Sequence, residues 1–355
     1  MKYLAHAALI LLVVSVLFGC STAPVDAPPE VTRASAENSG GVTSRARTIL
    51  LPPTSTPHVS PRPLDSARPD AETERQSIQQ EKRTTARTTP SATITRASRQ
   101  PFEGAELYVH LPPQAHSRQP LRIFLALHGM GNRGEAFSQN LIKIAEANNW
   151  VLVAPTLPYG DYFDPQQLRE DDLTLSRRLV DTLDVLPQRL NLKFYRQVLI
   201  YGYSRGAQLG HRFTYFYPER VKSIAVLSAG AYTMPTEQVA SGKGTPTIVP
   251  FPYGVGDLQE CVGKPINWQA LKQVSFWVGV GERDNQPNDV ARAFDPYGGR
   301  TRVERAESFK QALQNLGIKV SLVVFPNVSH ELVPEMRARA LQFLRDEELA
   351  DPLDH

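Results

Sequence analysis

Ser204 lies at the centre of the pattern Gly-x-Ser-x-Gly, between Gly202 and Gly206. An apolar, β-prone run at 197–201 precedes it, and residues 207–217 follow it with the apolar spacing of a helix. A sharp turn from strand to helix through this pattern is a nucleophile elbow, in which the glycines let the helix cross close to the strand. We therefore expect Ser204 to be a nucleophile. The alternative is an ordinary turn with a serine near the start of a helix.

A serine hydroxyl needs a base to take its proton, and the base needs a carboxylate to orient it. In hydrolases built on a doubly wound sheet, the carboxylate follows the serine in the chain and the histidine comes last. Asp284 follows the apolar run 274–280 and is the best-placed carboxylate. Glu282 and Asp289 are its rivals, and Asp295 is a more distant candidate.

His330 follows the last apolar run, 319–325, and precedes the last predicted helix. This is where the chain order of such a triad places the base. The other histidines lie outside the predicted domain, before the central sheet or along the elbow helix. We therefore expect His330 to act as general base and then as general acid, oriented by Asp284.

The tetrahedral intermediate of acyl transfer carries an oxyanion, which needs backbone N–H donors. The amide of Arg205 directly follows the nucleophile at the amino end of a predicted helix, whose dipole favours negative charge. The second expected donor is the amide of Met130, between two glycines after the predicted strand 121–127. We expect His128 to shape this turn and not to act as a base. The alternative is that the glycines serve only to reverse the chain.

Apolar runs of strand length alternate with amphipathic runs of helix length over residues 102–349. This alternation predicts an α/β fold: a doubly wound, mostly parallel sheet with helices on both faces. The predicted strands are 106–110, 121–127, 150–155, 197–201, 221–228, 274–280 and 319–325, and the predicted helices are 134–148, 171–186, 207–217, 302–316 and 332–344.

Residues 102–344 resemble the α/β-hydrolase family, through His128-Gly129-Met130-Gly131, the Ser204 elbow, Asp284 and His330 in family order. The form Gly-Tyr-Ser-Arg-Gly is similar to that of compact esterases related to polyhydroxybutyrate depolymerases and feruloyl esterases. The resemblance implies hydrolysis of a small or oligomeric carboxylic ester through an acyl-serine intermediate, without a metal or organic cofactor. Two alternatives stay open: a serine peptidase of the same fold, and a hydrolase-like surface protein that binds without turnover.

Residues 229–273 extend a minimal fold of this kind, and their Pro and Gly content predicts a small irregular flap. Phe251, Tyr253 and Trp268 lie in this insertion. They could line an acyl or alcohol pocket, or they could simply pack the insertion onto the domain.

Other side chains near the predicted site could contact substrate. Tyr203 flanks the nucleophile, and Tyr159 and Asp161 follow a predicted strand at the same edge of the sheet. The guanidinium of Arg205 could bind a substrate carboxylate. We expect it instead to pair with a local acid and hold the elbow.

Residues 1–19 have the short basic start and apolar core of a signal peptide. Their end, Leu17-Phe18-Gly19-Cys20, resembles the lipobox of bacterial lipoproteins. This resemblance implies cleavage before Cys20, a lipid such as palmitate on its sulfur, and anchoring in the cell envelope. Ser21, by the family's sorting tendency, favours the outer membrane, facing the periplasm or the surface. The alternative is a plain secretory signal.

Residues 20–101 are rich in Pro, Ser, Thr and Arg and have no apolar periodicity, which predicts a disordered tether. The net charge of the 355-residue chain is only +3, so nothing indicates a nucleic-acid partner. The chain has two cysteines. If Cys20 carries lipid, Cys261 has no disulfide partner, and we expect it to be a small packed residue.

Overall fold

The computed structural model describes residues 97–102, 105–115, 119–240 and 244–350. The predicted signal peptide, Cys20 and all but the last few residues of the predicted tether lie outside this part of the chain. Within it, the helices are too short or too polar to span a lipid bilayer.

An eight-stranded sheet forms the centre of the fold, with the strand order β1-β2-β4-β3-β5-β6-β9-β10. The pairs β1–β2 and β2–β4 are antiparallel, and the other pairs are parallel. The predicted mostly parallel, doubly wound sheet is therefore confirmed. The strands are β1 (Ala97–Phe102), β2 (Ala105–His110), β3 (Arg122–Leu127), β4 (Trp150–Pro155), β5 (Val198–Tyr203), β6 (Val221–Leu227), β9 (Ser275–Gly281) and β10 (Val320–Phe325).

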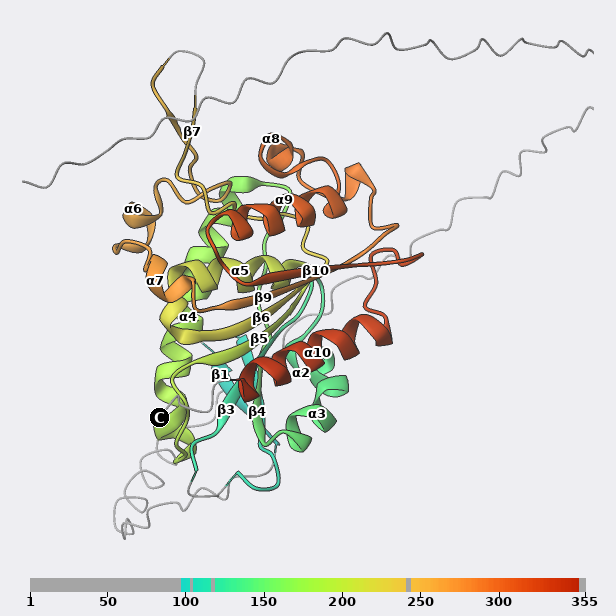
Figure 1. The fold of residues 1–355 in the computed structure, drawn as a ribbon. Helices are drawn as coiled ribbons and strands as arrows, with labels where there is room; N and C mark the ends of the chain where they lie inside the picture. The colour runs from blue at the N-terminus through green and yellow to red at the C-terminus, as the bar shows by residue number, and fades with distance from the viewer. Residues whose placement is uncertain (1–96, 103–104, 116–118, 241–243, 351–355) are drawn as a thin grey trace, which may run out of the picture. The chain divides into compact units, whose positions relative to one another are not determined.

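Helices cover both faces of this sheet, so most of its strands are apolar on both sides. Successive residues of β5 illustrate this: Ile200 belongs to one buried cluster, and Leu199 and Tyr201 belong to the other. Figure 1 shows α10 beside α2 and α3 on one side of the sheet, and α4, α5 and α9 on the other. These helices are α2 (Gly134–Ser138), α3 (Ile142–Ala147), α4 (Pro165–Leu190), α5 (Arg205–Phe216), α9 (Arg302–Asn315) and α10 (Pro334–Leu349).

The structure corrects three predicted segments. The predicted tether ends in β1, an edge strand that pairs with β2 through its backbone and so needs no apolar pattern. The predicted helix 134–148 is interrupted by a 3₁₀ turn at Gln139–Leu141. The predicted helix 171–186 begins earlier, at Pro165, because Asp164 caps it by accepting a hydrogen bond from the amide of Gln166 (2.9 Å).

The insertion at 229–273 contains a short antiparallel pair, β7 (Gln238–Val239) and β8 (Thr247–Ile248), and two short helices, α6 (Leu258–Val262) and α7 (Trp268–Leu271). Cys261 lies on α6 as a free thiol that donates a hydrogen bond to the carbonyl oxygen of Asp257 (3.0 Å). Burial raises the pKa of this thiol, which agrees with the packed residue that we predicted.

Candidate active site

The turn at Ser204 has the backbone geometry of a nucleophile elbow. Ser204 joins β5 to α5 with φ 52° and ψ −114°, a conformation that L-residues rarely adopt. A Cβ atom on Gly206 would lie 2.1 Å from the carbonyl oxygen of Leu127, and one on Gly202 would lie 2.7 Å from that of Gly206. Glycine is therefore required at both positions, because the helix crosses the neighbouring strands at backbone contact distance.

A continuous chain of hydrogen bonds links the serine to a histidine and a carboxylate. The Oγ atom of Ser204 lies 3.0 Å from Nε2 of His330, and Nδ1 of His330 lies 2.8 Å from Oδ2 of Asp284. Asp284 is only 2 % exposed, whereas His330 reaches the surface of the pocket. The three residues that the sequence singled out thus meet at the carboxyl end of the sheet.

The rival carboxylates do not reach the histidine. Glu282 accepts a hydrogen bond from the amide of Asn327 (2.9 Å). Asp295 pairs with Arg305 (2.8 Å) and with Arg292. Asp289 lies at the edge of the pocket, where its backbone carbonyl, not its carboxylate, takes part in the network described next.

Arg302, which the sequence did not indicate, occupies the second oxygen of Asp284. Its NH1 atom donates to Oδ1 of Asp284 (2.8 Å), and its NH2 atom donates to the carbonyl oxygen of Asp289 (2.9 Å). Both oxygens of Asp284 therefore have fixed partners, so its orientation toward His330 is fixed. A sequence pattern could not reveal this contact, because Arg302 is simply the first residue of α9, 18 positions after Asp284.

Tyr203 also contacts His330, through its hydroxyl and its ring. Its hydroxyl donates to the carbonyl oxygen of His330 (3.1 Å), and the two rings stack with centroids 5.4 Å apart. Burial, with the nearby Asp284 carboxylate, raises the pKa of Tyr203 to about 12, so the hydroxyl keeps its proton. Tyr203 also lines the pocket, as a substrate contact requires.

His128 shapes the turn that carries Met130. Its Nε2 atom accepts a hydrogen bond from the amide of Leu157 (2.9 Å), so the ring proton is on Nδ1, which donates to the carbonyl oxygen of Gly129 (2.7 Å). Burial lowers the pKa of His128, which favours this neutral form. A Cβ atom on Gly129 would lie 3.3 Å from Cβ of Ser204, so the turn passes directly beside the nucleophile.

The two expected oxyanion donors directly follow the two residues that approach each other: Met130 follows Gly129, and Arg205 follows Ser204. Arg205 is the first residue of α5, where the helix leaves its amide without an intrahelical partner. Met130 follows Gly129, and both line the pocket together with Ser204. Met130, Arg205 and Ser204 therefore line the same pocket.

The side chain of Arg205 points away from solvent and pairs with a buried acid, as we expected. Its NH1 atom lies 2.7 Å from Oδ1 of Asp172, an ion pair whose angles are not those of a hydrogen bond. The other oxygen of Asp172 accepts from Arg212 (2.5 Å), and all three side chains are at most 1 % exposed. Arg205 is therefore part of the scaffold under the elbow and does not contact substrate through its guanidinium.

Tyr159 belongs to the same scaffold, which corrects its prediction as a substrate contact. The guanidinium of Arg205 lies over its ring (4.7 Å), and its hydroxyl donates to the carbonyl oxygen of His128 (3.1 Å). The contacts Asp172–Arg205–Tyr159–His128 thus connect the two segments that carry the expected oxyanion donors. Tyr159 does not line the pocket.

Comparison with known proteins identifies the fold. The chain covers 98 % of poly(aspartic acid) hydrolase-1 from Sphingomonas sp. KT-1 with 70 % of its own length, at 20 % identity and a TM-score of 0.51. It covers 84 % of the poly(3-hydroxybutyrate) depolymerase LpqC from Bordetella parapertussis with 68 % of its own length, at 17 % identity and a TM-score of 0.50. The chain has the α/β-hydrolase fold. No family model and no curated protein sequence matches it.

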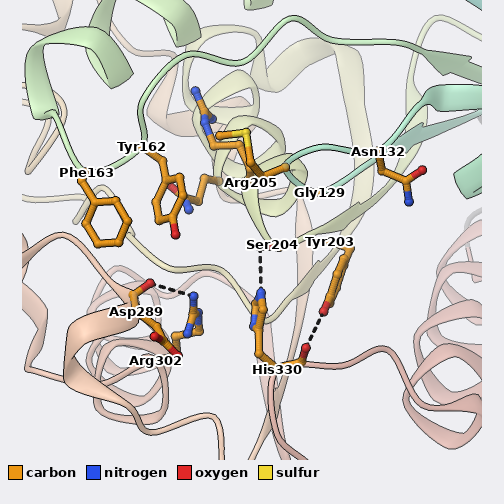
Figure 2. Close-up of a pocket in the computed structure, with 12 residues that line it drawn as sticks. Gly129, Asn132, Tyr162, Phe163, Tyr203, Ser204, Arg205, Asp289, Arg302 and His330 are labelled. Carbon is orange, nitrogen blue, oxygen red and sulfur yellow. Dashed lines mark hydrogen bonds between the residues drawn. The ribbon is translucent and has the colours of Figure 1, made fainter. Parts of the chain in front are cut away.

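A pocket of about 370 Å³ opens beside the serine at the active-site edge of this α/β-hydrolase fold. Figure 2 shows Tyr162 and Phe163 facing Asp289 and Arg302 across it, with Ser204 and His330 to one side. The sequence did not indicate Tyr162, Phe163 or the buried Gln208 as lining residues. The full lining is Gly129, Met130, Asn132, Tyr162, Phe163, Tyr203, Ser204, Arg205, Gln208, Asp289, Arg302 and His330.

The aromatic residues of the insertion do not line this pocket, so of the two alternatives that the sequence left open, the structure favours packing of the insertion onto the domain. Phe251 is 2 % exposed and packs against Phe216, with ring centroids 5.4 Å apart. Tyr253 stacks on Tyr297 (4.8 Å), and Trp268 packs against the main core. All three hold the insertion on the α/β-hydrolase core.

The described part of the α/β-hydrolase chain contains no cluster of three or more His, Cys, Asp or Glu side chains arranged to hold a metal ion. The groups that can do chemistry at the pocket include the hydroxyl of Ser204, the imidazole of His330 and the carboxylate of Asp284.

Proposed function

We propose that the protein is a carboxylic ester hydrolase that acts through an acyl-serine intermediate. The observation that carries this proposal is the hydrogen-bonded chain from Ser204 through His330 to the buried Asp284, at a strained turn that opens into a pocket. A serine held in this way has its base within reach and a free path to a carbonyl carbon.

Each residue then has a role. As Oγ of Ser204 attacks the carbonyl carbon, Nε2 of His330 takes its proton, and Asp284 stabilises the imidazolium. The amides of Arg205 and Met130 donate to the oxyanion. His330 returns the proton to the departing alcohol, leaving an acyl-serine. Water, deprotonated by His330, then releases the acid and restores the serine.

The form of the elbow and one of the two similar solved structures favour an ester as substrate. Gly-Tyr-Ser-Arg-Gly resembles the elbow of compact esterases, and one similar structure is described as a poly(3-hydroxybutyrate) depolymerase. The pocket is open at the surface, with Phe163 44 % exposed and Met130 40 % exposed, so it is accessible to an oligomeric ester as well as a small one.

A two-part assay tests the proposed function. A fluorophosphonate probe should label the protein, and a short-chain p-nitrophenyl ester should be hydrolysed in preference to a peptide p-nitroanilide. Turnover of the anilide in preference to the ester would identify a peptidase. Absence of both labelling and turnover would indicate a protein that binds its ligand without hydrolysing it, and would reject the proposal.

The scaffold under the elbow makes a separate prediction. Tyr159→Phe removes the hydrogen bond to the carbonyl of His128 and keeps the ring under Arg205. We expect kcat to fall roughly 10-fold with KM unchanged, because the Met130 amide loses its alignment with the oxyanion. A trifluoromethyl ketone, which forms a tetrahedral oxyanion on the serine, should lose affinity by the same factor.

Tyr215→Phe is the matched control for this change, because its hydroxyl also donates to a backbone carbonyl, that of Thr233 (3.1 Å), away from the pocket. Equal kinetic losses in both variants, or unchanged affinity of Tyr159→Phe for the ketone, would contradict a role in aligning the donors.

We also propose that a lipid on Cys20 attaches the protein to the bacterial cell envelope, because the sequence Leu17-Phe18-Gly19-Cys20 resembles a lipobox. Cys20→Ala should move the protein from the membrane fraction to the soluble fraction and abolish incorporation of labelled palmitate. Retention of the variant in the membrane fraction would reject lipid anchoring.

A further inference from the structure

A second cavity, of about 210 Å³, adjoins the active-site pocket. It lies between α2 and α10, and it shares Asn132 and Tyr203 with the first pocket. The two cavities therefore adjoin at Tyr203, on the side of the active-site pocket that faces α10. Its remaining lining residues are Ala136, Phe137, Asn140, Leu141, Tyr201, Leu332 and Arg337.

The charge of this second cavity is positive. Arg337 is the only charged residue among the described residues that line it. The structure gives Arg337 no carboxylate within ion-pair distance among the described residues; its recorded side-chain interaction is with Tyr201. Arginine without an acidic partner beside a substrate pocket is suited to binding a carboxylate, which matches the two-pronged geometry of the guanidinium.

Tyr201 is the neighbour of Arg337 in the wall of this cavity. The residue is completely buried, and its side chain interacts with the guanidinium of Arg337. Burial raises the pKa of Tyr201, and the nearby Arg337 only partly offsets this, so the hydroxyl keeps its proton. Because the hydroxyl stays neutral, it does not neutralise the positive charge of Arg337.

The other arginines near the serine are already neutralised. Arg205 pairs with Asp172, and Arg302 pairs with Asp284. The carboxylate of Asp289 also lies on the wall opposite Tyr162, which disfavours an anion in that part of the first pocket. Among the described residues that line the two cavities, Arg337 is therefore the cation left to pair with a negatively charged group on the substrate.

We propose that Arg337, positioned by Tyr201, forms a carboxylate-binding subsite, and that the preferred substrate is an ester whose acyl or alcohol part carries a carboxylate. Phe137, Leu141 and Leu332 provide the apolar wall for the carbon chain between the carboxylate and the scissile bond. This inference rests on the proposed function, because it places the same substrate's carbonyl carbon at Ser204.

Matched substrates test the preference without assuming which side of the ester enters the cavity. p-Nitrophenyl hemiglutarate compared with p-nitrophenyl valerate varies the acyl side, and 4-carboxyphenyl acetate compared with phenyl acetate varies the alcohol side. In at least one pair, we expect the charged ester to have the higher kcat/KM. Arg337→Gln should lower that charged-to-neutral ratio by about 10- to 100-fold, as expected for lost hydrogen bonds between charged groups.

Two further variants make this test specific. Tyr201→Phe, which keeps the ring, should lower the same ratio by about 3- to 10-fold. Arg339→Gln changes the net charge equally on the same helix, but Arg339 pairs with Glu335 (2.6 Å) and does not line the cavity, so the ratio should stay unchanged. A ratio that does not change in Arg337→Gln, or that falls equally in Arg339→Gln, would overturn the subsite.

A binding measurement separates this inference from the proposed function. Glutarate should bind the Ser204→Ala protein in a calorimetric titration, and Arg337→Gln added to that variant should abolish the binding. Ester turnover without glutarate binding would reject the subsite and leave the esterase intact. Glutarate binding that depends on Arg337, in a protein that hydrolyses no ester, would support the subsite and reject the esterase.

Discussion

Replacing Asp284 with asparagine is expected to lower kcat by about 10⁴-fold. Arg302 dictates the orientation of the new amide, because its NH1 atom donates to the Oδ1 position and needs an oxygen there. The amide NH₂ must then face Nδ1 of His330, which forces the ring proton onto Nε2. In that tautomer His330 cannot accept the proton of Ser204. Steady-state hydrolysis of a p-nitrophenyl ester measures the loss.

Asp289→Asn is the control for this prediction, since the carboxylate of Asp289 has no contact with His330 and its backbone carbonyl would still accept from Arg302. We expect a change of less than about 10-fold. If Asp289→Asn lost its activity and Asp284→Asn kept it, the assignment of Asp284 as the orienting acid would be wrong.

Ser204→Ala is expected to lower kcat by about 10⁶-fold, because no other group in the pocket can form the acyl intermediate. The fold should persist, since alanine adds no atoms in the turn. The chain offers a control in Ser228, a buried serine that also has positive φ (48°) and whose hydroxyl has no hydrogen-bond partner among the described residues.

Ser228→Ala should keep activity within about threefold and show a similar melting temperature to Ser204→Ala. Equal inactivation of both variants would mean that the strained turn, and not the hydroxyl of Ser204, is what activity depends on.

The elements that place the triad could be predicted because they depend on local patterns. Apolar runs identified the parallel strands, and chain order placed Ser204, Asp284 and His330 at their carboxyl ends. Glycine at 202 and 206 was informative for a physical reason: any side chain there would collide with the backbone. The glycines at 129 and 131 likewise indicated the turn that carries Met130.

The partners of these residues could not be predicted, because they come from distant parts of the chain. Asp172, in the middle of α4, looks like any polar residue of an amphipathic helix, yet it is buried between Arg205 and Arg212. Arg302 likewise looks like an ordinary helix start. Only the packing of helices against the sheet reveals these contacts.

Aromatic residues were also ambiguous in the sequence. Phe251 and Trp268 in the insertion pack onto the core, whereas Tyr162 and Phe163 line the pocket from the loop in which the sequence indicated Tyr159 and Asp161 instead. Hydrophobicity indicates that a side chain will be covered, but not whether protein or ligand covers it.

Direct detection of the acyl intermediate tests the central claim. The protein is mixed with p-nitrophenyl acetate, quenched in acid within the first turnover, and digested for mass spectrometry. We predict a burst of p-nitrophenol equal to the enzyme concentration and one acetyl group on the peptide that contains Ser204, with neither in Ser204→Ala. Turnover without a burst, or acetyl on a different residue, would contradict the account.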